Sequence, residues 1–201
     1  MTCQGWRWRF FALALFLPLI TACGKEHSGW AQFPVAIYAD SKVMGDSDAR
    51  ADFEAGMRFW EEKAGMSLFD FKGEWKDSTT PYKGTPDNPS DFAANVLFYQ
   101  NPWPFGAGIA GRTTNIINQD GIQNSIIMIN PGTVTCTGDC LSQPQESSLR
   151  KIFTHELGHF LGMNHVEDTA NIMNPVLTPG GSLDGQQVDL GALQELTKGG
   201  R

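Results

Sequence analysis

Hydrophobic residues fall into short runs along the chain, and their spacing predicts alternating strands and helices. The segment 34–39 alternates and is rich in Val, Ile and Tyr, which is typical of a β-strand. From Asp46 to Ala64 apolar residues recur at helical spacing. Asp46 or Ser47 can cap this helix, and Gly65 is a natural stop.

The region after this helix is predicted to hold most of a sheet. The expected strands are 66–75, 95–99, 109–116 and 125–129. Asp120-Gly121-Ile122 supplies a turn between the last two. The segment 77–90 is rich in Pro, Thr, Gly and Asp, so we expect it to be a loop.

Helical spacing returns in the C-terminal third. A second helix is predicted to begin near Ser142 or Ser147 and to end at Gly162. Residues 171–181 are irregular and rich in proline. Asp184 with Gln187 can form a capping box for a final helix that ends near Thr197. No internal repeat and no shift in composition indicates a second domain.

The N-terminal residues are expected to form a targeting signal and not part of the fold. Arg7 and Arg9 precede an apolar run over 10–20, which is the pattern of a secretory signal. This run is shorter than the roughly 20 apolar residues of a comfortable membrane span. A buried hydrophobic helix is the alternative. We therefore expect a signal peptide over 1–22.

The end of this run, Ile20-Thr21-Ala22-Cys23-Gly24, resembles the bacterial lipobox. The resemblance implies that Cys23 is lipidated and anchors the protein to the membrane of a bacterial envelope. Because residue 24 is Gly and not Asp, it favours sorting to the outer membrane over the inner one. We expect a lipidated tether over 23–32 and one domain over 33–201. Ordinary signal cleavage with a free Cys23 thiol is the alternative.

Composition narrows the possible functions. The 201 residues are 41% hydrophobic and carry a formal charge of −7, which suits one compact domain and disfavours a nucleic-acid partner. Maturation would leave Cys136 and Cys140 as the unmodified cysteines. In an exported protein these two are expected to form a disulfide. Two thiols with no nearby histidine would make a poor metal site.

Three of the four histidines lie within eleven residues, from His155 to His165. His155 and His159 are four positions apart, so on a helix both imidazoles project from one face and can reach one zinc ion. Gly162 permits a sharp exit from the helix, after which His165 can supply a third nitrogen. Three unrelated surface histidines are the alternative.

Three nitrogen ligands leave the fourth position of zinc open to water, which is the layout of a catalytic site. Zinc lowers the pKa of a bound water toward 7. Glu156 lies beside His155 and can act as the general base that takes a proton from that water. We therefore expect one catalytic Zn²⁺ held by His155, His159 and His165.

These residues resemble the metzincin superfamily of zinc peptidases. Its Met-containing turn is matched by Asn171-Ile172-Met173-Asn174-Pro175, and this Met-Asn-Pro sequence looks most like the matrixin branch. The resemblance implies an α+β fold of the metzincin-like zincin type. That fold has a twisted, mostly parallel five-stranded sheet with an antiparallel edge strand, an active-site helix, the Met-turn at Met173 and a C-terminal helix.

The same resemblance implies a protein or peptide substrate, cleaved by a zinc-dependent endopeptidase. In the family the substrate lies along an edge strand, for which the best candidate is 108–113. The expected substrate-binding residues are Gly108, Ile109, Ala110, Gly111, Pro175 and Val176. The wall of the subsite after the cleaved bond is placed near 175–177.

The sequence departs from matrixins in two respects. His27 is the only other histidine, so a second zinc held by histidines is not expected, and calcium is possible but cannot be placed. Val166 follows the third histidine where better-known branches have Ser, Glu or Asp. We expect a monomer. The alternative functions are a non-catalytic zinc-binding envelope lipoprotein and a zinc hydrolase of peptidoglycan peptides.

Overall fold

The computed structural model describes residues 29–77, 80–133 and 135–198. The predictions of a signal peptide over 1–22 and of lipidation at Cys23 lie outside these residues. In chain order the elements are β1 (Val35–Ala39), α1 (Ser41–Gly45), α2 (Ser47–Ala64), β2 (Phe69–Glu74), β3 (Lys83–Thr85), β4 (Asn88–Ser90), β5 (Val96–Tyr99), β6 (Gly111–Asn118), β7 (Gly121–Ile129), β8 (Thr135–Cys136), β9 (Ser147–Ser148), α3 (Leu149–Leu161) and α4 (Leu190–Thr197).

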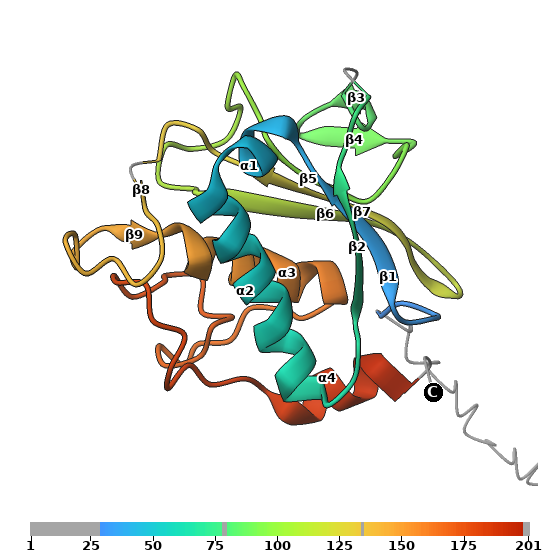
Figure 1. The fold of residues 1–201 in the computed structure, drawn as a ribbon. Coiled ribbons are helices and arrows are strands. Elements are labelled where there is room, and N and C mark those ends of the chain that lie inside the picture. The colour runs from blue at the N-terminus through green and yellow to red at the C-terminus, as the bar shows by residue number, and fades with distance from the viewer. Residues whose placement is uncertain (1–28, 78–79, 134, 199–201) are drawn as a thin grey trace, which may run out of the picture.

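Five strands form the main sheet in the order β2-β1-β5-β7-β6 (Figure 1). The pairs β2–β1, β1–β5 and β5–β7 are parallel, and β6 runs antiparallel to β7 at the edge. Central β5 is apolar and largely buried, whereas β6 has the polar sequence GRTTNIIN. This difference is expected, because a central strand is covered on both faces and an edge strand meets solvent. The mostly parallel sheet with an antiparallel edge strand is confirmed.

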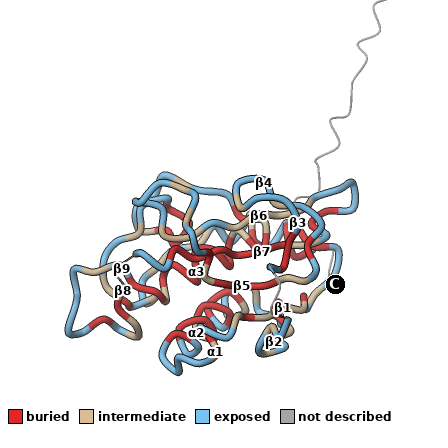
Figure 2. Tube along the Cα trace, turned by 90° about the horizontal axis from the view of Figure 1, so that it is seen from above, coloured by how far each residue is buried: buried red, intermediate tan, exposed pale blue. Residues whose placement is uncertain are grey.

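Helices α2 and α3 cover one face of the sheet, and α4 lies beside the end of α2 (Figures 1 and 2). Their apolar stripes build the main core, in which Phe53, Trp60, Phe153 and Phe160 are fully buried. The indole Nε1 of Trp60 donates to the carbonyl oxygen of Thr154 at 2.7 Å. This bond fixes α2 against the middle of α3, the helix that carries two of the three clustered histidines.

A smaller core lies on the other face of the sheet, under the hairpin formed by β3 and β4. The prediction of a loop over 77–90 is therefore wrong for part of that segment. Residues 86 and 87 form a tight turn, across which Thr85 pairs with Asn88. Composition favoured a loop here because Pro and Gly are depleted in strands, but a three-residue exposed strand tolerates both.

The predicted limits of α2 are confirmed. The Asp46 side chain accepts the backbone N–H groups of Asp48 and Ala49, and Gly65 ends the helix in a left-handed conformation with φ of 67°. Helix α3 begins at Leu149 with Ser148 as its N-cap, so the expected start near Ser147 is confirmed and the one near Ser142 is wrong. Residues 147–148 pair with β8, and this strand pairing delays the helix.

Two further boundaries differ from the prediction. The β6–β7 hairpin turns at 119–120, so Gly121 and Ile122 belong to β7. The final helix begins at Leu190, and its N-cap is Asp189 rather than Asp184. The backbone of Gln187 pairs with Ala170 and Ile172. Residue 187 is thereby held beside the turn at 171–174 and cannot enter the first turn of a helix.

The packed domain extends further toward the N-terminus than the expected tether over 23–32. Trp30 is only 5% exposed, and its indole stacks near Phe160 with ring centroids 5.0 Å apart. Its Nε1 donates to the carbonyl oxygen of Phe160 at 2.7 Å. The backbone of Gly29 accepts a hydrogen bond from Ile122 N–H. Gly29 and Trp30 are therefore part of the domain.

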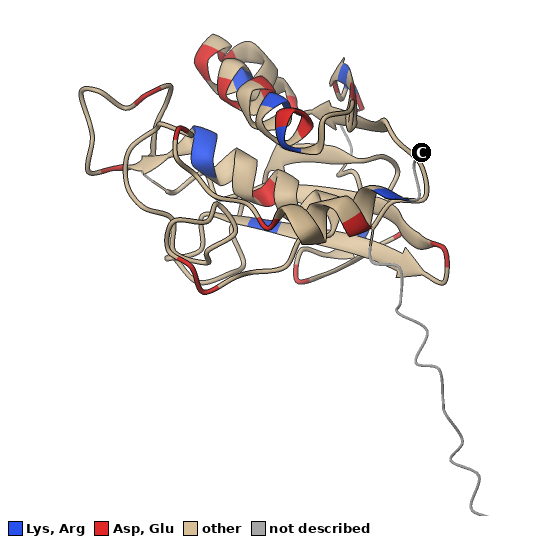
Figure 3. Ribbon diagram, turned by 90° about the horizontal axis from the view of Figure 1, so that it is seen from below, with Lys and Arg blue, Asp and Glu red and all other residues tan. Residues whose placement is uncertain are grey.

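Charged residues gather on α2, in the loops and on edge strand β2, while strands β1, β5 and β7 carry none (Figure 3). Within the described parts of the chain, no helix combines the length and apolarity needed to cross a bilayer.

Candidate metal centre

Helix α3 and the turn after it bring the three histidines together. His155 and His159 share one face of the helix, and Gly162 ends it in a left-handed conformation with φ of 100°. The N–H of Met163 donates to the Gly158 carbonyl oxygen, so the chain folds back over the last helical turn. This reversal returns His165 to the side where the first two imidazoles point.

The three Nε2 atoms converge on one point. Nε2 of His155 lies 3.1 Å from those of His159 and His165, and the latter two are 3.0 Å apart. Three nitrogen ligands at 2.0–2.1 Å from one tetrahedral zinc ion would be about 3.3 Å apart. The predicted ligand set is therefore brought together at a spacing close to that of a tetrahedral zinc site.

Backbone carbonyls orient two of these rings. Nδ1 of His155 lies 2.8 Å from the carbonyl oxygen of Ile172, and Nδ1 of His159 lies 2.8 Å from that of Met163. Since a carbonyl oxygen only accepts, each Nδ1 carries the hydrogen and each Nε2 presents a lone pair. Facing lone pairs at 3.1 Å repel each other, and a cation between them removes that repulsion. The donor set therefore fits a zinc ion.

Burial keeps the rings of His155 and His159 neutral, which is the form that binds metal. It lowers the pKa of His155 to about 4, and the neighbouring histidines lower it further. The pKa of His159 is also lowered, mainly by burial. His165 is exposed and completes the set from the solvent side.

The turn at 171–174 lies beneath the histidines, where the Met-turn was expected. Met173 is fully buried, and its carbonyl oxygen accepts the N–H of Val166, which ties this turn to the segment that carries His165. The side chain of Asn171 accepts the N–H of Met173 at 2.9 Å. Asn174 Nδ2 donates to the carbonyl oxygens of Val166 and Glu167. The two asparagines thus hold the turn and the third histidine in register.

Glu156 lies on α3 beside His155 and is only 5% exposed. Its Oε2 accepts a hydrogen bond of 2.6 Å from the hydroxyl of Thr113 on β6. Burial raises the pKa of Glu156 to about 7, against smaller lowering effects of Thr113 and Arg112. A carboxyl group that changes protonation near neutral pH is suited to act as a general base.

A cleft of about 710 Å³ runs along β6 and past the histidines. It is lined by all six residues expected to bind substrate: Gly108, Ile109, Ala110, Gly111, Pro175 and Val176. The first three, however, precede β6, which starts at Gly111 and not at Ile109. Both backbone groups of Ile109 already bond within the domain, to Gly106 and to the side chain of Asn130. Backbone pairing with a substrate would therefore involve β6 itself.

The wall of the cleft after Pro175 is fastened by a buried lysine. Nζ of Lys151, on α3 one turn before His155, lies 3.1 Å from the Thr178 hydroxyl and 3.2 Å from its carbonyl oxygen. Pro179 provides a third oxygen at 3.4 Å. Burial lowers the pKa of Lys151, because none of these partners is a carboxylate.

The predicted disulfide between Cys136 and Cys140 is present and closes a small loop beside this wall. The N–H of Gly138 donates to the buried carboxylate of Asp52 at 3.0 Å, and Arg150 Nε donates to the same carboxylate at 2.8 Å. The loop is thereby joined to α2 and α3. Burial raises the pKa of Asp52, and the bond from Arg150 opposes this rise.

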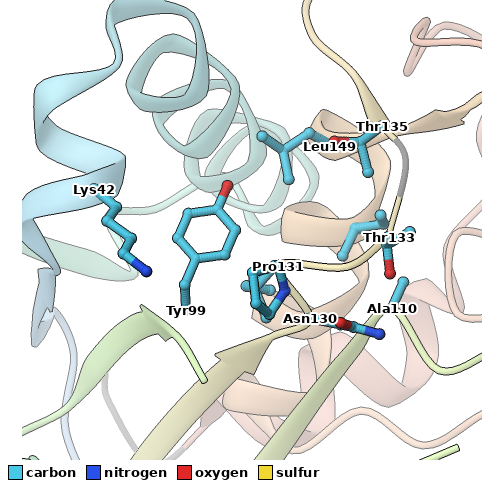
Figure 4. Close-up of a pocket in the computed structure, with 10 residues that line it drawn as sticks. Lys42, Tyr99, Ala110, Asn130, Pro131, Thr133, Thr135 and Leu149 are labelled. Carbon is cyan, nitrogen blue, oxygen red and sulfur yellow. The ribbon is translucent and has the colours of Figure 1, made fainter. Parts of the chain in front are cut away.

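A second cavity of about 260 Å³ adjoins the cleft, and Ala110 and Ile152 border both. Figure 4 shows Lys42 and Tyr99 on one side of it, with Thr133 and Thr135 on the other. Burial raises the pKa of Tyr99 to about 12, so its phenol stays neutral at ordinary pH.

Some residues of the site were not predicted from the sequence. They are Thr113, Asn115, Lys151, Asn171 and Asn174. Asn171 and Asn174 lie within two residues of Met173 in the expected turn. Thr113 ends the expected substrate strand 108–113, but no role for its hydroxyl was predicted. Asn115 and Lys151 carry no motif. Among the described residues no second group of three His, Cys, Asp or Glu side chains converges, and calcium receives no site.

Comparison with known proteins gives one family. The sequence model of the family described as matrixin matches residues 35–197. No curated protein matches the chain. Among solved structures, metalloproteinase-II from Bacteroides fragilis is similar over 77% of this chain, with 14% identity and a TM-score of 0.35. The chain spans 52% of the length of that protein.

Proposed function

The chain belongs to the matrixin family, and on that premise we propose that it is a zinc-dependent endopeptidase. The observation that carries the proposal is the convergence of three Nε2 atoms, 3.0–3.1 Å apart, beside the buried carboxyl of Glu156. A site that only stabilises a fold needs four protein ligands and no neighbouring base. Here the protein offers three ligands and a base.

His155, His159 and His165 would hold the zinc ion. When bound, zinc supplies a Lewis acid that lowers the pKa of water and stabilises negative charge on the carbonyl oxygen under attack. Glu156 takes the proton of the attacking water and later delivers it to the leaving amine. The carbonyls of Ile172 and Met163 keep two imidazoles in the tautomer with a free Nε2.

The cleft favours an extended peptide with apolar side chains. Edge strand β6 pairs with β7 on one side, so its other side is open to a peptide backbone. Three exposed aliphatic residues border the cleft: Ile109, Ile117 and Val176. Such exposure of large apolar side chains along one groove marks a binding surface.

The test compares the purified, zinc-loaded full chain with its Glu156→Gln variant on an unfolded protein. We expect cleavage by the wild type and its loss in the variant, with one zinc per chain in both. Glu62→Gln is the matched control, because Glu62 is exposed on α2, and it should cleave normally. Undiminished cleavage by Glu156→Gln would falsify the mechanism. A wild type that binds zinc but cuts neither proteins nor purified cell wall would favour the non-catalytic alternative.

We also propose that lipid on Cys23 anchors this domain to the envelope, with the outer membrane favoured by Gly24. Since the domain already includes Gly29, residues 24–28 would separate it from the lipid. Five extended residues reach less than about 18 Å, so the domain would stay close to the membrane. Mass spectrometry of the N-terminal peptide tests this. An unmodified Cys23 thiol in the protein from its native membrane would exclude the anchor.

A further inference from the structure

The carboxyl group of Glu156 lies in a cradle formed by two residues of β6, Gly111 and Thr113. The Thr113 hydroxyl is 2.6 Å from Oε2 of Glu156 and 3.0 Å from the main-chain carbonyl oxygen of the same residue. On the other side, a Cβ added to Gly111 would lie 2.6 Å from Oε1 and 2.8 Å from Cγ of Glu156. Gly111 therefore leaves the space that the glutamate side chain fills.

Thr113 is the one side chain that holds this carboxyl group among the described residues. The backbone of Thr113 adds a second hydrogen bond to the same carboxyl group, and Glu156 is only 5% exposed. A carboxyl group attached through three rotatable bonds would otherwise sample several positions near the cleft. Such sampling matters for a general base, because displacement of a reacting group by about 1 Å can lower a rate by roughly a hundredfold.

We propose that Thr113 is a positioning residue for Glu156, an inference that rests on the proposed peptidase function. The hydroxyl of Thr113 holds Oε2 and so leaves Oε1, which lies against Gly111, as the oxygen that can take the proton. Gly111 complements it by supplying room for that orientation. Thr113 acts through Glu156 and takes no part in proton transfer itself.

A hydroxyl group suits this task because it can both donate and accept. While Glu156 is ionised, Thr113 donates its hydrogen to Oε2. Once Glu156 has taken a proton, the carboxylic acid can donate to Thr113 Oγ1, and the threonine hydrogen can turn to the Glu156 carbonyl oxygen at 3.0 Å. The carboxyl group is therefore supported both before and after it receives the proton.

The alternative role for Thr113 is to dock β6 onto α3. Asn115, two residues along the same face of β6, does this by donating to the His159 carbonyl oxygen at 2.9 Å. A docking role predicts that a Thr113 variant is less stable, with no specific loss of kcat. A positioning role predicts a specific loss of kcat.

Thr113→Val keeps the shape of the side chain and removes the hydroxyl. In the zinc-loaded full chain we expect it to lower kcat by roughly tenfold to a hundredfold, with KM within about twofold of the wild type. Thr113→Ser should restore most of kcat. Thr114→Val is the matched control, because the neighbouring Thr114 hydroxyl has no partner among the described residues and does not line the cleft. Its kinetics should match the wild type.

A second measurement separates this proposal from the peptidase function. Crystal structures of the metal-free wild type and Thr113→Val would show the Glu156 carboxyl directly. We expect one position beside Thr113 Oγ1 in the wild type, and a displaced or divided carboxyl in the variant. An unmoved carboxyl, or a Thr113→Val enzyme with unchanged kcat, would overturn the proposal. A wild type that cleaves nothing would overturn the peptidase function, while the crystal structures would still decide whether Thr113 positions Glu156.

Discussion

Gly158 passes so close to Met173 that a methyl group at residue 158 would lie 2.3 Å from the thioether sulfur. The same methyl group would lie 2.6 Å from Cζ2 of Trp60. Met173 and Trp60 are both fully buried and cannot move aside freely. This contact sets the distance between the active-site helix and the turn below it.

Gly158→Ala should therefore destabilise the domain by about 1–3 kcal/mol, the usual range for overpacking a core. It should also weaken zinc binding, because Gly158 precedes His159 and moves with it. Urea unfolding with and without zinc measures both effects. Gly45→Ala is the control, since no atom lies within 4 Å of its added Cβ, and it should unfold like the wild type. Equal stability of the two variants would contradict the tight contact.

The pH dependence of stability should reveal two opposing groups in the metal-free protein. The pKa of Glu156 is raised from 4.5 to about 7. The stability that Glu156 contributes to the fold is therefore fully present below pH 4.5 and is lost as the pH rises through 7. The pKa of His155 is lowered from 6.5 to about 4. The stability that His155 contributes to the fold is therefore fully present above pH 6.5 and is lost as the pH falls through 4. Between about 4.5 and 6.5 the two slopes oppose each other.

Glu156→Gln removes the pH dependence of stability that comes from Glu156. Relative to the wild type, its free energy of unfolding should rise by about 2 kcal/mol between pH 4.5 and 6.5 in the presence of a chelator. Urea titrations across that range measure the difference. Parallel curves for the two proteins would mean that the pKa of Glu156 is not raised by folding.

Lys151→Met should loosen the wall of the cleft without unfolding the domain. Met keeps the length of the side chain and removes a buried ammonium, while the Thr178 and Pro179 oxygens lose their donor. Amide hydrogen exchange at Val176 and Gly180 should accelerate by roughly tenfold. The preference for substrate side chains should broaden. Lys76→Met, at an exposed position, is the control. Unchanged exchange in Lys151→Met would show that Lys151 does not hold the wall.

Trp30 should contribute to stability as a core residue. Trp30→Ala is expected to lower the free energy of unfolding by about 3–5 kcal/mol. Trp30→Phe keeps the ring contact with Phe160 and loses the bond to its carbonyl oxygen, so about 1 kcal/mol should be lost. Thermal unfolding of the three proteins gives the order. If Trp30→Ala unfolds at the same midpoint as the wild type, residue 30 belongs to the tether and not to the core.

Local patterns in the sequence were enough to select the three clustered histidines and to place most of the helices and strands. Spacing places His155 and His159 on one helical face whatever surrounds them, because the helical repeat decides it. Asp46 and Gly65 likewise mark the limits of α2 through bonds made within the same few residues. The mostly parallel sheet with an antiparallel edge strand was not worked out from spacing but came with the family resemblance, and the strand pairings confirm it.

The boundaries that were wrong depend on contacts between distant segments. Helix α3 does not start near Ser142, the earlier of its two predicted starts, because 147–148 pair with 135–136. Helix α4 starts late because Gln187 pairs beside the turn at 171–174. Local capping signals compete with such pairings, and no local pattern shows which one prevails.

The sequence by itself determined which atoms meet at the metal centre, because a helix and a glycine-ended turn are local structures. Only the tertiary structure decided what surrounds them. The cradle of Glu156 between Gly111 and Thr113, the bonds of Lys151 to the wall and the docking of Trp30 each join segments far apart in the chain. Burial in that assembled structure is also what raises the pKa of Glu156 and lowers that of His155, since desolvation depends on the neighbours that folding provides.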